Sequence, residues 1–163
     1  LLTGVGAIFM TPTAMADDAS GSASITVRQP VSLTNTTDLA FGTVDAPTDA
    51  TTTFTIANNG GTSTSGGNGV FATGEAAGVV TIAAENGQTI ALSAAASTCT
   101  GATGVALTTI TGDYNGTAFD SATANTATFS SAVTTIDVGG SVTVDVGTTG
   151  AATCAYTVTV NYN

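Results

Sequence analysis

A period-two alternation of apolar residues with threonine and serine is the strongest constraint on this chain. Phe54 and Ile56 alternate with threonines, and Val142, Val144 and Val146 alternate with polar residues. This alternation is typical of β-strands with one buried face, and no stretch shows the sustained 3.6-residue period of a helix. The clearest stretch ends the chain, and its alternating positions are Cys154, Tyr156, Val158, Val160 and Tyr162. We therefore expect an all-β protein.

Glycine-rich turn signals separate these stretches. Asn86-Gly87, between two alternating runs, predicts a tight hairpin, and Gly139-Gly140 predicts a second one. The Gly- and Ser-rich segment from about residue 60 to 69 is interpreted as a flexible loop. Several short strands with such turns predict an antiparallel sandwich or barrel. A chain of 163 residues is long enough for one domain with a single core.

The near-absence of positive charge excludes most chemistry. The chain has no Lys, His or Trp, and Arg28 is its one cation against 11 carboxylates, for a formal net charge of −10. Without His or Lys, the usual acid–base and nucleophilic constellations cannot form, so we expect no enzyme and no cofactor. Two cysteines are too few for a zinc site, so no metal is expected. An acidic chain is also repelled by nucleic acid and by anionic membrane surfaces.

Residues 1–16 indicate export. The apolar run from Leu1 to Met10, followed by Pro12 and by Ala14-Met15-Ala16, is typical of the tail of a secretory signal and its cleavage site. The run is too short to span a bilayer, which takes about 20 apolar residues. The alternative is a retained extension that lies as a strand in a groove of another subunit. Both interpretations predict a secreted protein whose single domain covers residues 17–163.

Cys99 and Cys154 are the two cysteines of the chain. In an exported chain, two cysteines most simply form one disulfide, and we predict that bond here. Two buried free thiols are the alternative. A redox role is not expected, because there is no CxxC motif and no cation to lower the pKa of a thiol.

Two regions resemble a known family. One runs from Gln29 to Val44 and contains Phe41-Gly42, and the other runs from Ile136 to Val144, with a matching end from Tyr156 to Asn163. They resemble a family of secreted bacterial domains of unknown function (number 4402), which is similar in pattern to spore-coat-U-like and archaic chaperone–usher pilin subunits. The resemblance spans about residues 22–163. It implies an immunoglobulin-like antiparallel β-sandwich with a surface or filament role and no catalytic residues, with a periplasmic chaperone and an outer-membrane usher as further partners.

Unprotected sheet edges favour self-assembly. Monomeric proteins protect the free edges of sheets with Lys, Pro or inward-pointing charges. This chain has no Lys, and its carboxylates lie mostly in expected loops or near strand ends, with Asp145 as an exception. A strand from a neighbouring copy would satisfy such an edge, and head-to-tail repetition gives a fibre. We therefore expect a pilus-like extracellular homopolymer joined by donated β-strands.

Two segments are candidate donor strands. If the N-terminal run is retained, its apolar residues Leu1, Leu2, Val5, Ile8 and Phe9 would fill the groove. Otherwise the donor is the segment from Ala19 to Val27, in which Ala23, Ile25 and Val27 alternate with polar residues in a predicted strand. The candidate groove or core residues are Leu39, Phe41, Gly42, Tyr156, Val158, Val160 and Tyr162.

Each of these groove residues also has a simpler interpretation. Gly42 would let another strand approach closely, or it marks a bend beside a core Phe41. Tyr156 and Tyr162 would anchor an interface, or they pack in the core. Arg28 would pair with a carboxylate of a neighbouring chain, or it is solvated.

Other functions stay open at this point. Asp113-Tyr114-Asn115-Gly116 with Asp120 resembles a loose calcium loop, but the spacing fits a plain Asx turn better. The rivals to a filament are a soluble or surface-attached adhesin that binds glycans, and a non-filamentous coat or matrix protein. A glycan-binding module would need exposed aromatic residues, and no Trp is present to stack on sugars.

Overall fold

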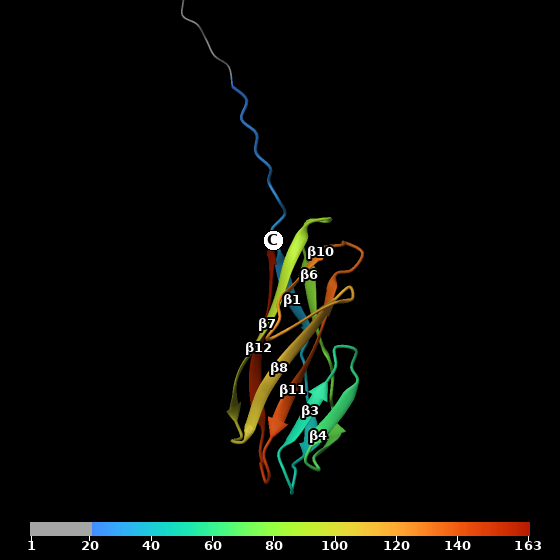
Figure 1. The fold of residues 1–163 in the computed structure, drawn as a ribbon, viewed down its shortest axis with the longest axis vertical. Helices are drawn as coiled ribbons and strands as arrows, with labels where there is room; N and C mark the ends of the chain where they lie inside the picture. The colour runs from blue at the N-terminus through green and yellow to red at the C-terminus, as the bar shows by residue number, and fades with distance from the viewer. Residues whose placement is uncertain (1–20) are drawn as a thin grey trace, which may run out of the picture.

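The computed structural model describes residues 21–163, and these form an all-β protein whose strands run along the long axis of the molecule (Figure 1). No helix in this part of the chain has the length and apolar character that a membrane crossing requires. The strands are β1 (Ser32–Thr37), β2 (Thr43–Asp45), β3 (Thr52–Ile56), β4 (Thr62–Gly66), β5 (Val70–Thr73), β6 (Gly78–Ala83), β7 (Thr89–Gly101), β8 (Val105–Tyr114), β9 (Thr117–Asp120), β10 (Asn125–Thr128), β11 (Thr135–Val144) and β12 (Ala152–Tyr162).

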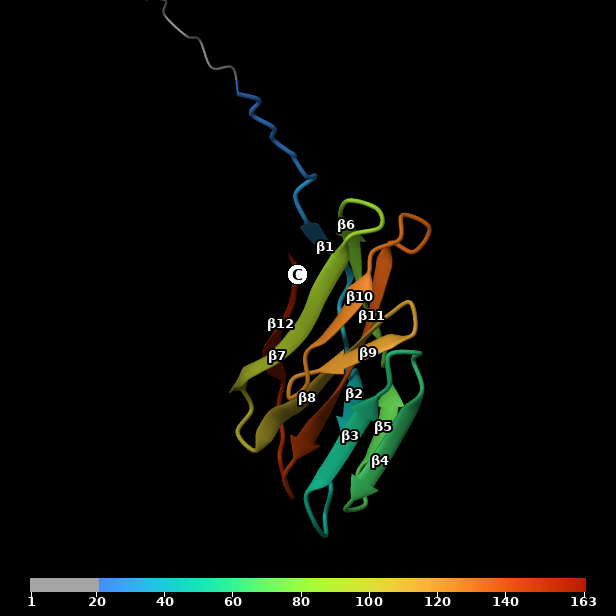
Figure 2. The ribbon, with the colours of Figure 1, turned by 45° about the horizontal axis from the view of Figure 1, so that its top comes forward.

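The strands form an antiparallel β-sandwich, as the alternation predicts. The larger sheet has the order β1-β6-β11-β3-β4, and β8 and β9 continue it on the other side of β11. The second sheet has the order β10-β7-β12, and β2 and β5 form a separate pair. Figure 2 shows β7, β12 and β10 lying across from the larger sheet. The long strand β11 therefore organises the larger sheet, because it pairs with β6, β3 and β8 along its length.

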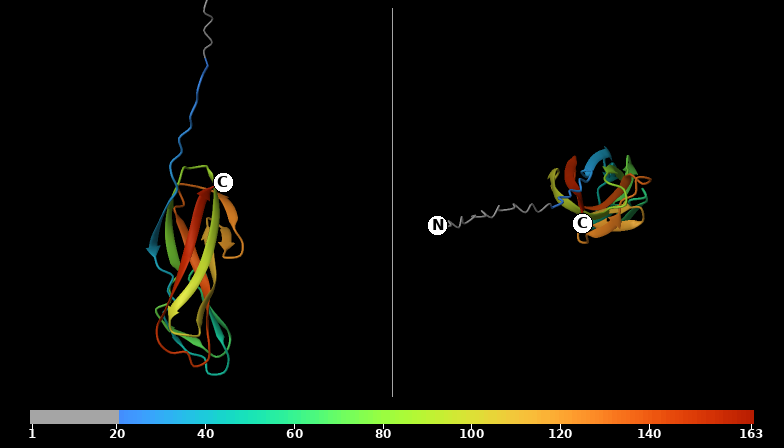
Figure 3. Two further views of the ribbon diagram at one scale, coloured as in Figure 1. Left: turned by 90° about the vertical axis from the view of Figure 1, so that its left-hand side faces the viewer. Right: turned by 90° about the horizontal axis from the view of Figure 1, so that it is seen from above.

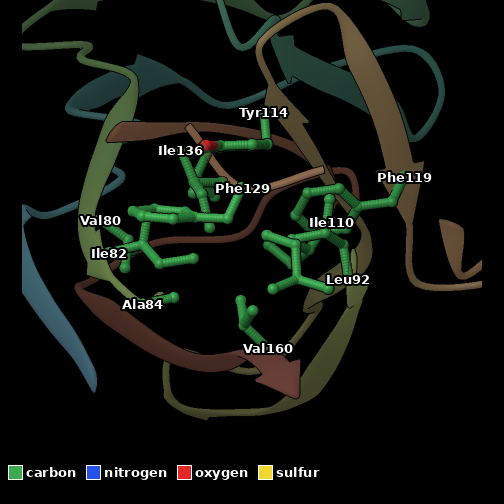
Figure 4. Close-up of a cluster of buried hydrophobic side chains, with 12 residues drawn as sticks. Val80, Ile82, Ala84, Leu92, Ile110, Tyr114, Phe119, Phe129, Ile136 and Val160 are labelled. Atoms are coloured by element: carbon green, nitrogen blue, oxygen red, sulfur yellow. The ribbon is translucent and has the colours of Figure 1, made fainter. Parts of the chain in front are cut away.

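The main core lies between the two sheets (Figure 4). Ile110 and Ile136 from the larger sheet meet Ile90 and Leu92 from β7, and all four side chains are fully buried. In sequence they alternate with Thr, Ser, Asp or the small Ala91, because successive side chains of a strand point to opposite faces of the sheet. Burial of each of these side chains stabilises the fold by about 1.5–3 kcal/mol.

Tyr114 brings a hydroxyl into this core with its hydrogen bonds satisfied. Its ring stacks on Phe129 with 6.2 Å between the ring centroids. Its hydroxyl accepts a hydrogen bond from the Ser130 N–H at 2.8 Å and donates one to the Val133 carbonyl at 3.0 Å. A buried hydroxyl without partners would cost free energy, so these two bonds allow Tyr114 to hold the β10–β11 connection against β8.

A second, smaller core lies beside β3. Phe54, Val142 and Val144 are buried there, and the β2–β5 pair covers them. Phe71 of β5 meets Phe54 edge-to-face, with 5.1 Å between ring centroids. The aromatic pair therefore fastens the β2–β5 pair to the larger sheet.

The Gly139-Gly140 hairpin prediction is wrong, because β11 runs straight through both glycines. A Cβ atom on Gly139 would lie 2.4 Å from the Ile56 carbonyl oxygen, and one on Gly140 would lie 2.8 Å from the Thr109 carbonyl oxygen. The two glycines therefore allow close approach of neighbouring backbone within the sheet, which is the other common reason for glycine in a strand.

Asn86-Gly87 forms a turn but not a hairpin. The strands on either side of it, β6 and β7, pair in different sheets. Their inward faces meet across the core, where Ile82 of β6 and Ile90 of β7 are both fully buried. The turn therefore connects the two layers of the sandwich. An Asn-Gly turn signal is the same for such a connection as for a hairpin.

Three further expectations differ from the structure. The segment expected to be a flexible loop contains β4, which pairs in continuous register with β3. The strand predicted around Ala23 to Val27 is not formed within this chain, and residues 21–30 have no regular secondary structure. Asp145, expected inside a strand, follows the end of β11, whereas Asp137 is the carboxylate within that strand.

Gly139→Ala is expected to lower the free energy of unfolding by about 1–3 kcal/mol, because the new methyl group must displace the β3 backbone. Urea unfolding followed by circular dichroism measures this change. Gly21→Ala is the matched control, since nothing lies within 4 Å of its Cβ position. Equal stability of the two variants would contradict this account of β11.

Candidate functional site: an open flank of the sandwich

The sandwich is closed along one flank and open along the other. On the closed flank, β9 and β10 approach each other, and the Asn125 side-chain amide donates a hydrogen bond to the Ala118 carbonyl at 2.9 Å. On the open flank lie β1 and β12, and among the described residues each pairs on one side only, with β6 and β7 respectively. The right-hand view of Figure 3, from above, shows the blue β1 and the red β12 on the same side of the molecule. Two unpaired backbone edges therefore border the same space.

A groove of about 420 Å³ lies between these two edges. Val80 at its base is buried, but the inward-facing Leu33, Tyr156 and Val158 are only half-buried. The next inward-facing residue of β12, Val160, is 6% exposed because the core covers it. The core is therefore incomplete along the groove. The lining residues are Leu33, Asn35, Asp38, Val80, Cys154, Ala155, Tyr156, Thr157 and Val158.

Tyr156 adds a polar atom to this apolar lining. Its hydroxyl oxygen is buried and has no hydrogen-bond partner within the described part of the chain. Burial raises the pKa of the Tyr156 hydroxyl above its ordinary value of 10.0; the nearby Leu39 N–H opposes this shift, and the Asp38 carboxylate adds to it. The Leu39 N–H does not meet hydrogen-bond geometry with this oxygen. The hydroxyl is therefore neutral at physiological pH.

At the far end of β12, Tyr162 holds the segment that precedes β1. Its hydroxyl accepts a hydrogen bond from the Glu85 N–H at 2.7 Å and donates one to the Gln29 carbonyl at 2.5 Å. The Arg28 guanidinium lies over its ring, 5.8 Å from the centroid. Such a cation–π contact contributes about 0.5–1 kcal/mol at an exposed site. Tyr162 therefore connects β12 to the root of the N-terminal segment.

Residues 21–30, which we call the arm, have no strand partner and are exposed along their length. The arm leads away from the domain beyond the ends of the strands (Figure 1). Ile25 is 87% exposed and Val27 is 82% exposed, which is more than the other exposed large apolar residues. In an extended conformation these two side chains point to one side and Ser24 and Thr26 to the other. The arm thus has the alternating sequence of a β-strand but pairs with no strand of the described chain.

The sequence profile of the family described as Domain of unknown function (DUF4402) matches residues 31–162. The chain belongs to this family. No curated protein and no solved structure matches the chain. The match covers every strand of the DUF4402 domain from β1 to β12 and leaves the arm outside it.

The predicted disulfide between Cys99 and Cys154 is confirmed. The two residues lie directly opposite each other on β7 and β12 of the DUF4402 domain, with 4.0 Å between their Cα atoms. Cys154 also lines the groove. The bond therefore cross-links β12, which forms one wall of the groove, to β7 within the second sheet.

The predicted groove residues lie at four different places in the DUF4402 domain. Tyr156 and Val158 line the groove, and Leu39 packs against the main core close to Tyr156. Val160 is buried in the core, and Tyr162 holds the arm root. Phe41 packs on the second core.

Gly42 and the N-terminal candidates are placed differently. Gly42 has a φ of +66°, and a Cβ atom there would lie 2.2 Å from the Thr73 carbonyl oxygen. The strand that approaches it is thus β5 of the same chain. The other donor candidates lie outside the described residues: Leu1, Leu2, Val5, Ile8 and Phe9.

Sequence reasoning missed Leu33, Asn35 and Val80 as lining residues. Leu33 is the one apolar residue within β1, so a period-two pattern gives it little weight. The loose calcium loop is a set of turns here, because Asp113 accepts the Gly116 N–H at 2.9 Å and Asp120 accepts the Ala122 N–H at 2.7 Å. Within residues 21–163, no group of three or more potential metal-binding side chains is gathered.

The double variant C99S/C154S is expected to lose about 4 kcal/mol of unfolding free energy, because the bond closes a loop with a sequence separation of 55. Urea unfolding of the variant and of chemically reduced wild-type protein measures the loss, and both should give the same value. A loss below about 1 kcal/mol would contradict a structural role for the bond.

Proposed function

We propose that this chain is the structural subunit of an extracellular bacterial filament, in which each subunit donates its arm as a β-strand to the groove of the next. The observation that carries the proposal is the coexistence of the groove and the arm: an apolar groove between two unpaired edges, and an exposed, alternating segment without a partner. Of the candidate donors, we assign this role to the part of Ala19 to Val27 that lies in the arm. Its Ile25 and Val27 are highly exposed, and their burial in a groove would be favourable.

The donated strand complements the groove in two ways. Its backbone can pair with both β1 and β12, which satisfies two edges at once. Ile25 and Val27 would cover the half-buried Leu33, Tyr156 and Val158, and burial of each donor side chain contributes about 1.5–3 kcal/mol.

The geometry of the arm favours donation to another copy. The contacts of Tyr162 with Gln29 and Arg28 hold the arm root, and the arm continues beyond the ends of the strands of its own domain (Figure 1). The arm and the groove are different surfaces, so their contact is head-to-tail and does not close, which gives a fibre. An exported subunit with an open groove also fits a periplasmic chaperone that occupies the groove temporarily and an outer-membrane usher that assembles the fibre.

Trypsin offers a direct measurement of arm occupancy. The chain holds one Lys or Arg residue, Arg28, so trypsin has a single cleavage site, at the root of the arm. We expect free subunits to be cut at this site and subunits within filaments to resist, because the donated arm is held in a neighbouring groove. Mass spectrometry of timed digests measures both rates. Intact filaments that are cut as fast as free subunits would exclude the arm as the donor.

The double variant I25D/V27D is expected to abolish filaments in negative-stain micrographs, because two carboxylates cannot be buried in the groove without a large desolvation cost. The matched control S24D/T26D adds the same charge on the other side of the arm and should still form filaments.

The rival functions give different images. Discrete wild-type particles that bind a glycan array would indicate an adhesin, and amorphous aggregates would indicate a coat or matrix protein. Filaments formed equally by I25D/V27D and by the control would exclude the arm as donor.

A further inference from the structure

A second exposed edge, separate from the groove, belongs to β4. Within the described residues, β4 pairs only with β3, and all five of its residues are exposed. Its pairing with β3 is regular, whereas β1, β2 and β12 each contain a register shift. β4 also holds no charged residue and no Pro, which are the usual protections of a free edge. β4 is thus a regular and unprotected template for another strand.

Two hydrogen bonds show which backbone groups of β4 are free. The Ala57 N–H donates to the Gly61 carbonyl at 2.7 Å, and the Gly67 N–H donates to the Thr51 carbonyl at 3.1 Å. Hydrogen-bonded and non-hydrogen-bonded pairs alternate along an antiparallel ladder, so Ser63 and Ser65 also bond to β3. The N–H and C=O groups of Thr62 and Thr64 therefore point away from β3, to the free edge.

We propose that β4 is a lateral self-association edge, which pairs antiparallel with β4 of a second copy about a two-fold axis. In this register, Thr62 exchanges its two backbone hydrogen bonds with Thr64 of the second copy, and Thr64 does so with Thr62. Ser63 then faces Ser63 of the second copy across the axis in a closely spaced, non-hydrogen-bonded pair. The contact uses the same segment on both sides, as a two-fold interface requires.

The side chains of this edge suit a second copy of the same chain. A net charge of −10 makes most contacts between copies repulsive, but β4 brings no charge to the interface. Ser63 lies opposite Thr55 on the outer face of the larger sheet, and the Thr55 hydroxyl bonds to the Ser141 hydroxyl at 2.8 Å. Pairing of two β4 strands would extend this row of hydroxyl residues into the second copy, and such cross-strand hydroxyl pairs are stabilising.

This edge is independent of strand donation. Donation uses β1, β12 and the arm, whereas β4 pairs with β3. β3 and β6 follow one another along the same edge of β11, so β4 and β1 lie at different places along the length of β11. Both contacts can therefore form at once. Because the strands run along the long axis of the molecule (Figure 1), a two-fold axis across β4 places two filaments side by side in opposite directions.

The test introduces Ser63→Cys into the full-length I25D/V27D variant, in which strand donation is blocked. Facing Cα atoms in a non-hydrogen-bonded pair are about 4.5 Å apart, which lies in the range for a disulfide. We expect S63C to form a covalent dimer in mild oxidant, with a link between the two introduced sulfurs identified by mass spectrometry. Ser65→Cys is the matched control, since two copies of that residue would be offset by four residues, about 13 Å.

Thr64→Pro, added to S63C, removes an outward N–H and leaves the β3 ladder intact, so the dimer yield should fall at least about tenfold. Thr64→Lys is a second variant that should act in the same way through like-charge repulsion across the axis. Equal dimer yields from S63C and S65C, or an S63C dimer that survives both Thr64 substitutions, would overturn the β4 proposal. Because arm donation is blocked in these proteins, failure of the filament proposal leaves this result unaffected.

Discussion

The edges of β1 and β12 at the open flank have no partner strand within the described residues, and the groove, the disulfide and the arm root all lie along them. A strand edge presents a row of N–H and C=O groups that pair with water when nothing better is available. Here β1 and β12 both present such a row, and the side chains between them are apolar. Water can satisfy the two edges, but it does not cover Leu33, Tyr156 and Val158 favourably. Both features support the proposal that a strand from another copy completes this sandwich.

Several contacts hold the strands beside this flank in position. The disulfide fixes β12 to β7 at one end of the groove, and Tyr162 ties β12 to the root of the arm at the other. The main core, with Ile110 and Leu92 fully buried, holds the two sheets in position. Under the proposed strand donation, a groove held in this way is formed before the strand binds, so little ordering entropy is lost.

Local sequence patterns predicted the inward faces of strands and the disulfide better than they predicted which strands pair. The alternation along β12 correctly predicts that Tyr156 and Val160 face inward, and two cysteines in such a chain correctly predict their disulfide. The Asn86-Gly87 and Gly139-Gly140 signals were misleading because a glycine serves a turn, a layer crossing or a close backbone approach equally well. β4 was missed because serine and threonine in a Gly-rich segment have no apolar alternation, and only its pairing with β3 makes it a strand.

Residue type and period alone indicate the all-β class, the inward face of the last strand and the near-absence of positively charged side chains. Which strands are edges of a sheet is known only from the folded chain. Edge status depends on partners far apart in the chain, such as β1 with β6 and β7 with β12, and no local window contains both members of such a pair. The groove, the unpaired arm and the free edge of β4 are all consequences of that long-range pairing, which is why they became visible only in the folded chain.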